Sequence, residues 1–341
     1  MNKKNSYITW YEKLSGHIRY WKDFIEMVIS VSSVFSSPNK VLWNIFNNKF
    51  PLEVKLKDNT KITLESFNAL YLISKVYKVE NFEVDSKNDE VTINFLEYGK
   101  ELIFHGGMNN GDIANIFIKN EYDFLKVKNK TVLDIGANIG DTAIFFASRG
   151  ANKIIGVEPF HRNFNLAKKN IASNNFQDKI YLTRSACSSK NGSVKINPQF
   201  DSGIESRMEN FQEGEDVPII TIRDIIDKYS IPKCSILKID CEGCEYDIIE
   251  NISSEVLAYF DYIQIEYHQG YRNLKEKLES YGYDVRISKP HATNVINTLL
   301  SGLIKDRKNS INGKSNHEIG YAGFLYASKN IDLNWRFIDI N

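Results

Sequence analysis

The 341-residue sequence carries no excess of either charge. Lysine and arginine together number 43, and so do aspartate and glutamate, so the formal net charge at pH 7 is zero. Proteins that bind nucleic acid usually carry a basic excess, because much of their affinity comes from contacts with phosphate. The balanced composition therefore argues against a nucleic-acid partner.

Long apolar runs are missing as well, and cysteine is scarce. No apolar stretch reaches the roughly 18 residues that predict a membrane-spanning helix. The start of the sequence lacks the apolar core and the cleavage site of a signal peptide. The four cysteines, Cys187, Cys234, Cys241 and Cys244, are predicted to be free thiols, which fits a reducing, cytoplasmic location.

The length suits about two domains of roughly 150 residues each, or one large domain with an extension. Residues 1–110 are predicted to form a small α+β region. The apolar periodicity predicts, in chain order, a helix, a hairpin, a second helix and further strands, over residues 7–36, 52–65, 66–78, 82–96 and 100–105.

Apolar residues recur along the predicted N-terminal helix at spacings of three or four, at positions Trp10, Leu14, Ile18, Trp21, Ile25 and Val28. Such a stripe usually faces the core of its own protein, and this is the interpretation that we favour. The alternative is a helix that binds a membrane surface or a partner.

Residues 111–341 follow a different pattern. Short apolar strands alternate with amphipathic helices from residue 131 onward, which predicts a Rossmann-like, mainly parallel α/β sheet with helices on both faces. Thr221, followed three positions later by Asp224, predicts the capped start of one of these helices. The long polar loop 199–216 is a candidate lid over a ligand.

The segment VLDIGANIGDT, residues 132–142, is the strongest motif. A buried strand ends at Asp134, and Gly136, Asn138 and Gly140 form the turn into the next helix, where open α/β sheets bind ligands. The turn lacks the G-x-G-x-x-G spacing of a dinucleotide site. A carboxylate at this point would repel a pyrophosphate, but it suits a ligand with an ammonium group, such as S-adenosylmethionine. The other interpretation is a structural turn with an incidental aspartate.

Two further strand ends extend the predicted cofactor site. Glu158 ends the second strand, where a carboxylate can accept hydrogen bonds from both hydroxyls of a ribose. Pro159 then suits the start of the following helix. Small or polar residues after the third strand, including Ser185 and Ala186, are candidates for contact with an adenine ring, although many such loops would look similar.

The segment LKIDCEGCEYDII, residues 237–249, places Asp240, Glu242 and Glu245 close together after another strand. These carboxylates could position a substrate hydroxyl, accept its proton, or hold a divalent cation. The structural alternative is an acidic helix start, because acidic side chains stabilise helix N-termini.

Cys241 and Cys244 lie in the same turn. A zinc site needs four ligands, and the isolated Cys187 and Cys234 provide no second pair. A redox disulfide is another alternative. We favour the interpretation that the two cysteines are small residues filling a tight turn.

The strand YIQIEYH ends in Glu266 and His268. Glu266 could join Asp240 to bind a cation, because the ends of neighbouring strands converge. His268 could act as a general base, because the ordinary pKa of histidine lies near neutral. A single histidine at a strand end is otherwise simply a polar side chain.

Taken in order, these motifs resemble the FkbM family of methyltransferases over about residues 112–287. The D-x-E-G-x-E turn that starts at Asp240 distinguishes this family from other class I methyltransferases. The resemblance implies a seven-stranded sheet of order 3-2-1-4-5-7-6, whose antiparallel strand 7 would be GFLYAS. It also implies O-methylation of a hydroxyl on a sugar, glycan or natural-product-like small molecule, and it places residues 109–123 beside the cofactor.

The sequence thus predicts an S-adenosylmethionine-dependent methyltransferase that aligns donor and acceptor. Cofactor contacts are predicted for Asp134, Gly136, Asn138, Gly140, Glu158, Pro159, Ser185, Ala186 and Asp240. Catalytic roles are predicted for Asp240, His268, Glu242 and Glu245. A divalent cation is not expected, although it stays open. The alternatives are a nicotinamide oxidoreductase and a non-catalytic, cofactor-binding scaffold. The oligomeric state and the roles of residues 1–105 and 288–318 stay open.

Overall fold

The computed structural model describes residues 8–47, 49–95, 100–196, 214–293, 295 and 320–329. A large central sheet runs in the order β14-β16-β13-β12-β6-β7-β8, and β15 pairs beside β16. Its strands are β6 (Thr131–Ile135), β7 (Lys153–Val157), β8 (Ile180–Thr183), β12 (Ser235–Ile239), β13 (Phe260–Tyr267), β14 (Asp284–Ile287), β15 (His291–Thr293) and β16 (Gly320–Ser328).

The strand order confirms the predicted fold class. Five strands, from β8 through β7, β6 and β12 to β13, pair in parallel. The last strand, β16, lies antiparallel between β13 and β14. Numbered along the chain, this is the predicted order 3-2-1-4-5-7-6 with strand 7 reversed, and GFLYAS is part of that strand.

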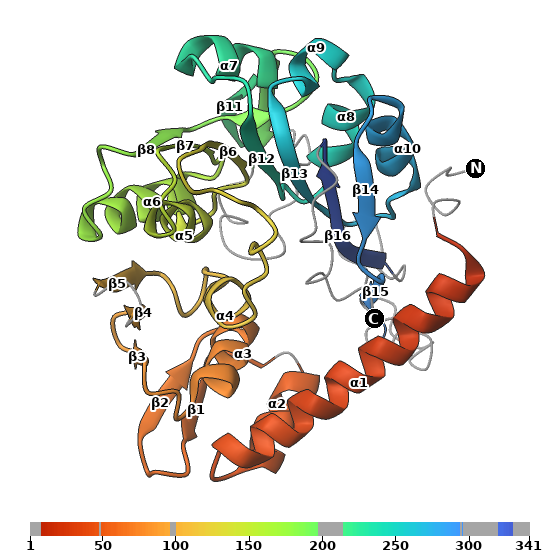
Figure 1. Cartoon of the computed structure of the whole chain (residues 1–341). Helices are drawn as coiled ribbons and strands as arrows, with labels where there is room; N and C mark the ends of the chain where they lie inside the picture. Colours follow the sequence, from red (N-terminus) through yellow and green to blue (C-terminus); the bar gives the residue numbers. More distant parts are fainter. Residues whose placement is uncertain are drawn as a thin grey trace.

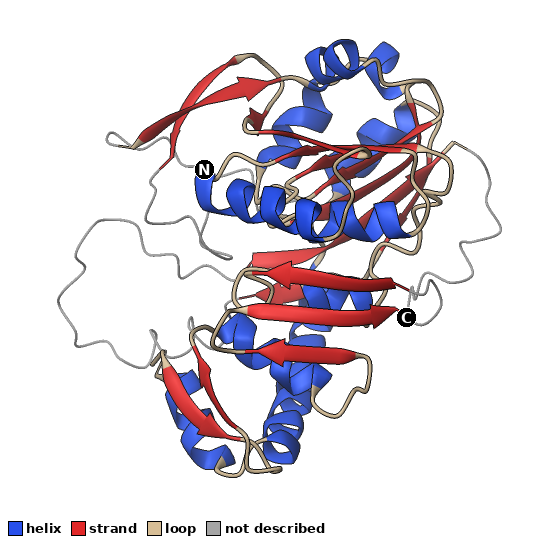
Figure 2. Ribbon diagram, turned by 90° about the vertical axis from the view of Figure 1, so that its left-hand side faces the viewer, coloured by secondary structure: helices blue, strands red, loops and turns tan. Residues whose placement is uncertain are grey.

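Helices cover both faces of the central sheet (Figures 1 and 2). One face packs against α4 (Ile113–Phe117), α5 (Asp141–Ser148) and α6 (His161–Ser173), and the other against α7 (Ile222–Tyr229), α8 (Cys244–Asn251), α9 (Ser254–Leu257) and α10 (Arg272–Ser280). A separate hydrophobic core lies on each face of the sheet, and successive residues of a strand point alternately into one core and the other. Val132 belongs to the first and Leu133 to the second, which explains why the strands read as continuous apolar runs.

The N-terminal region contains the predicted helices and strands, together with a helix over residues 38–46 that the periodicity did not predict. They are α1 (Trp10–Val34), α2 (Pro38–Phe46), β1 (Leu52–Lys55), β2 (Lys61–Leu64), α3 (Phe67–Val76), β3 (Phe82–Asp85), β4 (Glu90–Phe95) and β5 (Lys100–His105). Buried residues of this region, such as Leu70 and Phe104, share one core with Phe145 of α5. The division of the chain near residue 110 stays a prediction.

The interpretation that the apolar positions predicted along this helix face the core is wrong. Trp10, Ile18 and Ile25 are exposed, whereas α1 buries a different face that contains Gly16, Val31 and Val34. The sequence pattern was misleading because both faces of this helix carry apolar residues. The buried face is short and is interrupted by polar residues, so the more regular stripe dominated the periodicity.

A small second sheet lies beside the pocket end of the fold. It joins β9 (Ala186–Cys187), β10 (Gly192–Ile196) and β11 (Glu215–Ile220) in the order β10-β11-β9.

The predicted capping pair of α7 is present, because the side chains of Thr221 and Asp224 each accept a backbone hydrogen bond from the other residue. The candidate lid 199–216 falls almost entirely outside the described residues. Within the described part of the chain, no helix combines the length and apolar character needed to cross a bilayer.

Candidate functional site

The turn after β6 depends on a glycine at position 136. Gly136 has φ +82°, and a Cβ atom there would lie 1.7 Å from the backbone oxygen of Asp240. Only glycine therefore permits the β6 turn and the β12 turn to touch. Asn138, two residues further along this turn, also has positive φ. Gly140 then forms the N-cap of α5.

Asp134 lies beneath this turn, not in the ligand pocket. Its side chain is fully buried and lies 3.1 Å from the Nζ atom of Lys238, and it accepts a hydrogen bond from Thr142. The structure therefore gives Asp134 a supporting position in place of the direct contact with an ammonium group that the sequence suggested. Because side chains alternate along a strand, Asp134 points into the protein. There it lies beside the ammonium group of Lys238, which is outside the segment 132–142.

Lys238 is a site residue that the sequence analysis missed. Its ammonium group donates to the backbone oxygen of Gly136 at 2.7 Å and also lies 3.8 Å from Asp240. The charges of Asp134 and Asp240 raise the pKa of Lys238 in spite of its burial. A lysine within the apolar strand SILKI was the available signal, because a buried charge requires a partner.

Glu158 links the β6 turn to the end of β7. One carboxylate oxygen accepts a hydrogen bond from the backbone N–H of Asn138, and the other accepts one from Phe160, both at 2.9 Å. Pro159 precedes α6, which begins two residues later. Glu158 is 3% exposed, yet it lines a ligand-sized pocket. A carboxylate in this position can accept hydrogen bonds from ligand hydroxyls.

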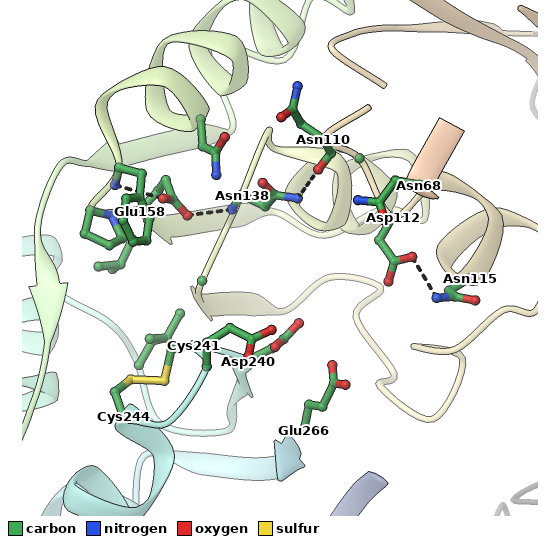
Figure 3. Close-up of a pocket in the computed structure, with 18 of the residues that line it drawn as sticks. Asn68, Asn110, Asp112, Asn115, Asn138, Glu158, Asp240, Cys241, Cys244 and Glu266 are labelled. Carbon is green, nitrogen blue, oxygen red and sulfur yellow. Dashed lines mark hydrogen bonds between the residues drawn. A yellow bond between two sulfur atoms is a disulfide. The ribbon is translucent and has the colours of Figure 1, made fainter. Parts of the chain in front are cut away.

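The pocket has a volume of about 390 Å³, within the range of small-molecule sites. Figure 3 shows Glu158 at one end, Asp112 and Asn115 at the other, and Asp240 and Glu266 along one side. The predicted residues that line it are Gly136, Asn138, Glu158, Pro159, Ser185, Ala186, Asp240 and Glu242. The predicted residues that are not among its lining residues are Asp134, Gly140, Glu245 and His268.

Three buried polar atoms of the pocket wall have no hydrogen-bond partner among the described residues: Asn110 Nδ2, Asn163 Oδ1 and Ser185 Oγ. Each residue is at most 5% exposed. Such atoms are normally satisfied, so they indicate where a polar ligand would bind. Only Ser185 was named from the sequence. Asn110 lay within the stretch 109–123 that the resemblance placed beside the cofactor, and nothing in the sequence signalled Asn163.

The acidic turn splits its three carboxylates between two environments. Glu242 and Gly243 both have positive φ, and this reversal turns Glu245 inward. Glu245 is completely buried and accepts a hydrogen bond from the backbone N–H of Gly243 at 2.8 Å. Its second oxygen lies 3.0 Å from Nδ1 of His268. Glu245 therefore positions His268, while Asp240 and Glu242 face the pocket.

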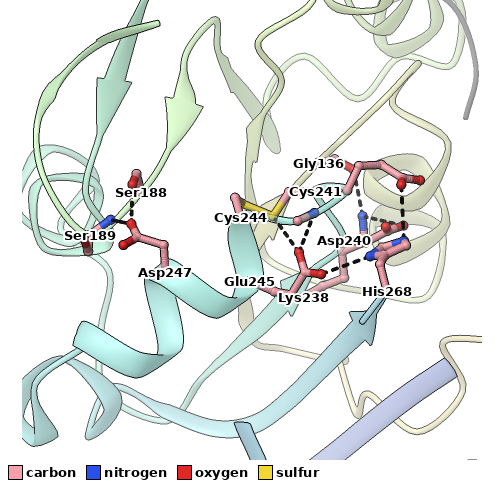
Figure 4. Close-up of a disulfide and its surroundings, with 12 residues drawn as sticks. Gly136, Ser188, Ser189, Lys238, Asp240, Cys241, Cys244, Glu245, Asp247 and His268 are labelled. Atoms are coloured by element: carbon pink, nitrogen blue, oxygen red, sulfur yellow. Dashed lines mark hydrogen bonds and ion pairs between the residues drawn. A yellow bond between two sulfur atoms is a disulfide. The ribbon is translucent and has the colours of Figure 1, made fainter. Parts of the chain in front are cut away.

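The prediction that all four cysteines are free is wrong for the two that lie in this turn. Cys241 and Cys244 form a disulfide (Figure 4). The turn brings their Cα atoms to 5.6 Å, which is within the usual range for a disulfide. Cys187 is free and buried, and Cys234 is free and exposed. The cysteine spacing was compatible with a bridge, but the backbone reversal that permits it was not visible in the sequence.

His268 is surrounded by carboxylates. Burial alone would lower its pKa, but the hydrogen bond and charge of Glu245, together with Glu242 and Glu266, raise the pKa of His268 to about 10. At neutral pH the imidazole therefore carries a proton and cannot accept another. This charge state argues against the general-base role predicted for His268 and makes it a fixed positive charge.

The raised pKa of His268 has a measurable consequence for stability. Because the folded pKa of about 10 exceeds the ordinary value of 6.5, protonated His268 stabilises the fold fully below pH 6.5 and loses this effect as the pH rises toward 10. We expect His268→Gln to be less stable than the wild type by about 3 kcal/mol at pH 6. Urea unfolding should show this difference shrinking steadily up to pH 10.

The control for this effect is His105, whose pKa is lowered, mainly by burial. A His105→Gln variant should follow the opposite trend, gaining on the wild type as the pH falls. A His268→Gln difference that is constant between pH 6 and 10 would contradict a protonated His268.

Acidic groups outnumber basic groups around the pocket. Burial, with the charges of Asp141 and Asp240, raises the pKa of Asp112 to about 7. Burial and Asp112 raise the pKa of Glu121 to about 8. Burial and Asp240 hold the pKa of Glu266 well above its usual range. Part of this acid is therefore protonated near neutral pH, as is common where a ligand or a reaction uses the group.

Asp240, Glu266 and His268 offer ligand atoms that lie within 4.8 Å of one another. This separation would suit a divalent cation. A histidine ligand has to be neutral, however, and the protonated state of His268 opposes metal binding here.

The strand order and the position of the pocket define a class I methyltransferase type of Rossmann-like fold. The turns after β6, β7 and β12 all contribute to the pocket, as expected for a ligand at the carboxyl ends of parallel strands. Residues 134–285 match the family described as the methyltransferase FkbM domain. This part of the chain is therefore similar to FkbM methyltransferase domains, and the match leaves the N-terminal region outside it.

Solved structures with a similar chain path include precorrin-6y C5,15-methyltransferase from Geobacter metallireducens, at 12% identity and a TM-score of 0.35, covering 62% of this chain and 87% of that one. Another is TrmK of M. capricolum in complex with S-adenosyl-homocysteine, at 11% identity and a TM-score of 0.37, covering 63% and 68%. The strand order, not these distant similarities, defines the fold. A search of curated proteins found no match.

Proposed function

We propose that the protein transfers a methyl group from S-adenosylmethionine to a hydroxyl of a sugar, glycan or natural-product-like small molecule. The observation that carries this proposal is the single pocket that Glu158 and Asp240 share, each at the carboxyl end of a parallel strand. Glu158 suits a ribose, and Asp240 suits a reacting hydroxyl. The methyltransferase family of residues 134–285 supports the reaction class.

The residues present fit this cofactor. The carboxylate of Glu158 lines the pocket and can accept hydrogen bonds from ribose hydroxyls. The unpartnered atoms of Ser185 and Asn163 can contact the polar edge of an adenine. Asn110 Nδ2 is an unpartnered donor beside the glycine turn, because the backbone oxygen of Asn110 accepts a hydrogen bond from Asn138 at 2.7 Å. We assign Asn110 to the carboxylate of the amino-acid part.

Bound S-adenosylmethionine would supply an electrophilic methyl group. Asp240 lines the pocket and can orient an acceptor hydroxyl and take its proton. The positive charge of His268, which lies 3.5 Å from Glu242 and 3.9 Å from Glu266, offsets acidic charge next to Asp240. Glu245 holds the imidazole in place. The protein therefore mainly aligns two reactants, which can supply much of the rate.

The acceptor side of the pocket comes from the N-terminal region. Phe67, Asn68 and Tyr71 of α3 line the pocket together with Asp112 and Asn115. Aromatic rings and amide or carboxylate groups of this kind suit a hydroxyl-rich ligand, because the rings contact its apolar faces and the polar groups bond its hydroxyls. We propose that α3 takes part in binding the acceptor.

Calorimetry with S-adenosylmethionine tests the cofactor assignment. We expect Glu158→Ala to weaken binding roughly 100-fold, because the variant loses ribose contacts and the acceptor for the Asn138 backbone N–H. Glu255→Ala, which removes an exposed carboxylate, is the control and should bind like the wild type. Absence of binding to the wild type, or equal binding by both variants, would overturn the assignment.

Two further measurements separate the alternatives. Stabilisation by NADH but not by S-adenosylmethionine in a thermal-shift assay would indicate an oxidoreductase. Methyl transfer is measured with labelled cofactor against a panel of sugars, glycans and phenolic hydroxyl compounds. Cofactor binding without any transfer to this panel would indicate a cofactor-binding scaffold.

A further inference from the structure

Exposed apolar side chains are concentrated on one part of the molecule. Among the described residues, eleven large hydrophobic side chains are exposed, and nine of them belong to α1 and α2. These nine are between 42 and 76% exposed: Trp10, Tyr11, Leu14, Ile18, Trp21, Ile25, Ile29, Trp43 and Phe46. A contiguous apolar surface of this kind marks an interaction site on most proteins.

Helix α1 is held firmly by its opposite face, so the exposed side chains have a defined direction. The guanidinium of Arg19 donates to the backbone oxygen of Pro290 at 3.0 Å, and Val31 and Val34 belong to the main core. Figure 1 shows α1 running along the outer edge of the molecule. The apolar stripe therefore faces outward from an anchored helix.

The α1 stripe, which consists of Trp10, Leu14, Ile18, Trp21, Ile25 and Ile29, has a symmetrical spacing. Its intervals are four, four, three, four and four residues, so the pattern reads the same in both directions. It also repeats every eleven residues, which is close to the period of a straight helix. The stripe thus runs straight for about 28 Å at 1.5 Å per residue.

A symmetrical stripe is complementary to itself when two copies run in opposite directions. Pairing about the midpoint sets every stripe residue against another, with Trp10 opposite Ile29, Leu14 opposite Ile25 and Ile18 opposite Trp21. Interfaces between identical chains need this self-complementarity about a two-fold axis.

We propose that α1 pairs with α1 of a second copy of this chain, antiparallel and about a two-fold axis. The exposed side chains of α1 and α2 offer roughly 1,000 Å² of apolar surface, similar to the roughly 800 Å² per partner in a stable complex. This inference does not depend on the proposed methyl transfer.

The charges of α1 favour a protein partner over a lipid surface. Three basic residues, Lys13, Arg19 and Lys22, are balanced by three acidic ones, Glu12, Asp23 and Glu26. Helices that lie on membranes usually carry a basic polar face, which α1 lacks.

Sedimentation equilibrium of the full chain tests the proposal. We expect the wild type to be a dimer and Trp21→Glu to weaken dimerisation roughly 30-fold or more. Tyr181→Glu is the matched control, because Tyr181 is also 42% exposed but lies on β8, and it should stay dimeric.

Chemical cross-linking tests the direction of pairing. In a Cys234→Ser background, a short bismaleimide should link two copies of Ile18→Cys, which lie near the two-fold axis. It should not link two copies of Trp10→Cys, which would lie about 28 Å apart. Linking at position 10 in preference to position 18 would overturn the antiparallel register. A monomeric wild type would overturn the proposal, and binding to phosphatidylcholine–phosphatidylglycerol vesicles by that monomer would assign the stripe to membranes.

Discussion

Replacing Lys238 with methionine is expected to destabilise the protein by about 3–5 kcal/mol, the usual cost of removing one partner of a buried ion pair. Methionine keeps a similar length and apolar character, so the cavity effect is small. The substitution leaves the fully buried Asp134 without its cation and removes the donor to the backbone oxygen of Gly136. Urea unfolding at pH 7 measures the loss.

A double variant separates charge from packing. Lys238→Met combined with Asp134→Asn removes both charges, and Asn can still accept the hydrogen bond from Thr142. We expect the double variant to recover much of the stability, because an uncharged pair carries no unpaired buried charge. If it is no more stable than Lys238→Met alone, the ion pair is not the source of the effect.

Lys153→Met provides the matched control. Lys153 lies on the neighbouring strand β7, and its ammonium group donates to the backbone oxygen of Tyr229 without a buried carboxylate partner. We expect this variant to lose no more than about 1 kcal/mol, as for an ordinary hydrogen bond. An equal loss in both variants would mean that the two lysines contribute similarly.

Alanine at position 136 is expected to abolish detectable cofactor binding. The added Cβ would lie 1.7 Å from the backbone oxygen of Asp240, so the turns after β6 and β12 would have to separate. That movement would displace Asn138 and Asp240, which both line the pocket. Calorimetry with S-adenosylmethionine should show a loss of at least 100-fold, or about 2.7 kcal/mol.

The control for backbone strain is Gly282→Ala. Gly282 has φ +83°, almost the same as Gly136, but a Cβ atom there meets nothing within 4 Å. The variant should lose about 1 kcal/mol of stability from strain alone and bind the cofactor normally. Normal cofactor binding by Gly136→Ala would show that the two turns can separate without damage to the site.

The fold was accessible from the sequence because its determinants are local. The strands that begin at Thr131, Lys153 and Ser235 are short apolar runs flanked by turn residues, and both sides of each run are buried. A single sequence therefore predicted a mainly parallel sheet. The antiparallel β16 was expected from the family resemblance, because no local pattern specifies the direction in which a strand is inserted.

The positions of the site residues were only partly accessible. Glu158 and Asp240 follow strands directly, so the strand direction alone brought both to one edge of the sheet. Side-chain direction was not accessible in the same way. Asp134 points inward to Lys238, and Glu245 turns inward to His268, because strand alternation and a reversed turn decide which carboxylates face solvent.

The charge state of His268 also depended mainly on carboxylates from another segment of the chain. Its pKa is set by Glu245, Glu242 and Glu266, which come from the turn after β12 and from β13. A histidine in a linear motif has an ordinary pKa near neutral, and only three-dimensional packing changes it.

The sequence by itself determined the strand–helix alternation, the glycine turn at residues 136–140 and the strand-end carboxylates, because each depends on residues a few positions apart. Tertiary structure decided the pairing of Lys238 with Asp134, the disulfide between Cys241 and Cys244, the contribution of α3 to the pocket and the outward face of α1. These features depend on contacts between segments that are distant in the chain, because such contacts determine which side chains are buried and which charges lie close together.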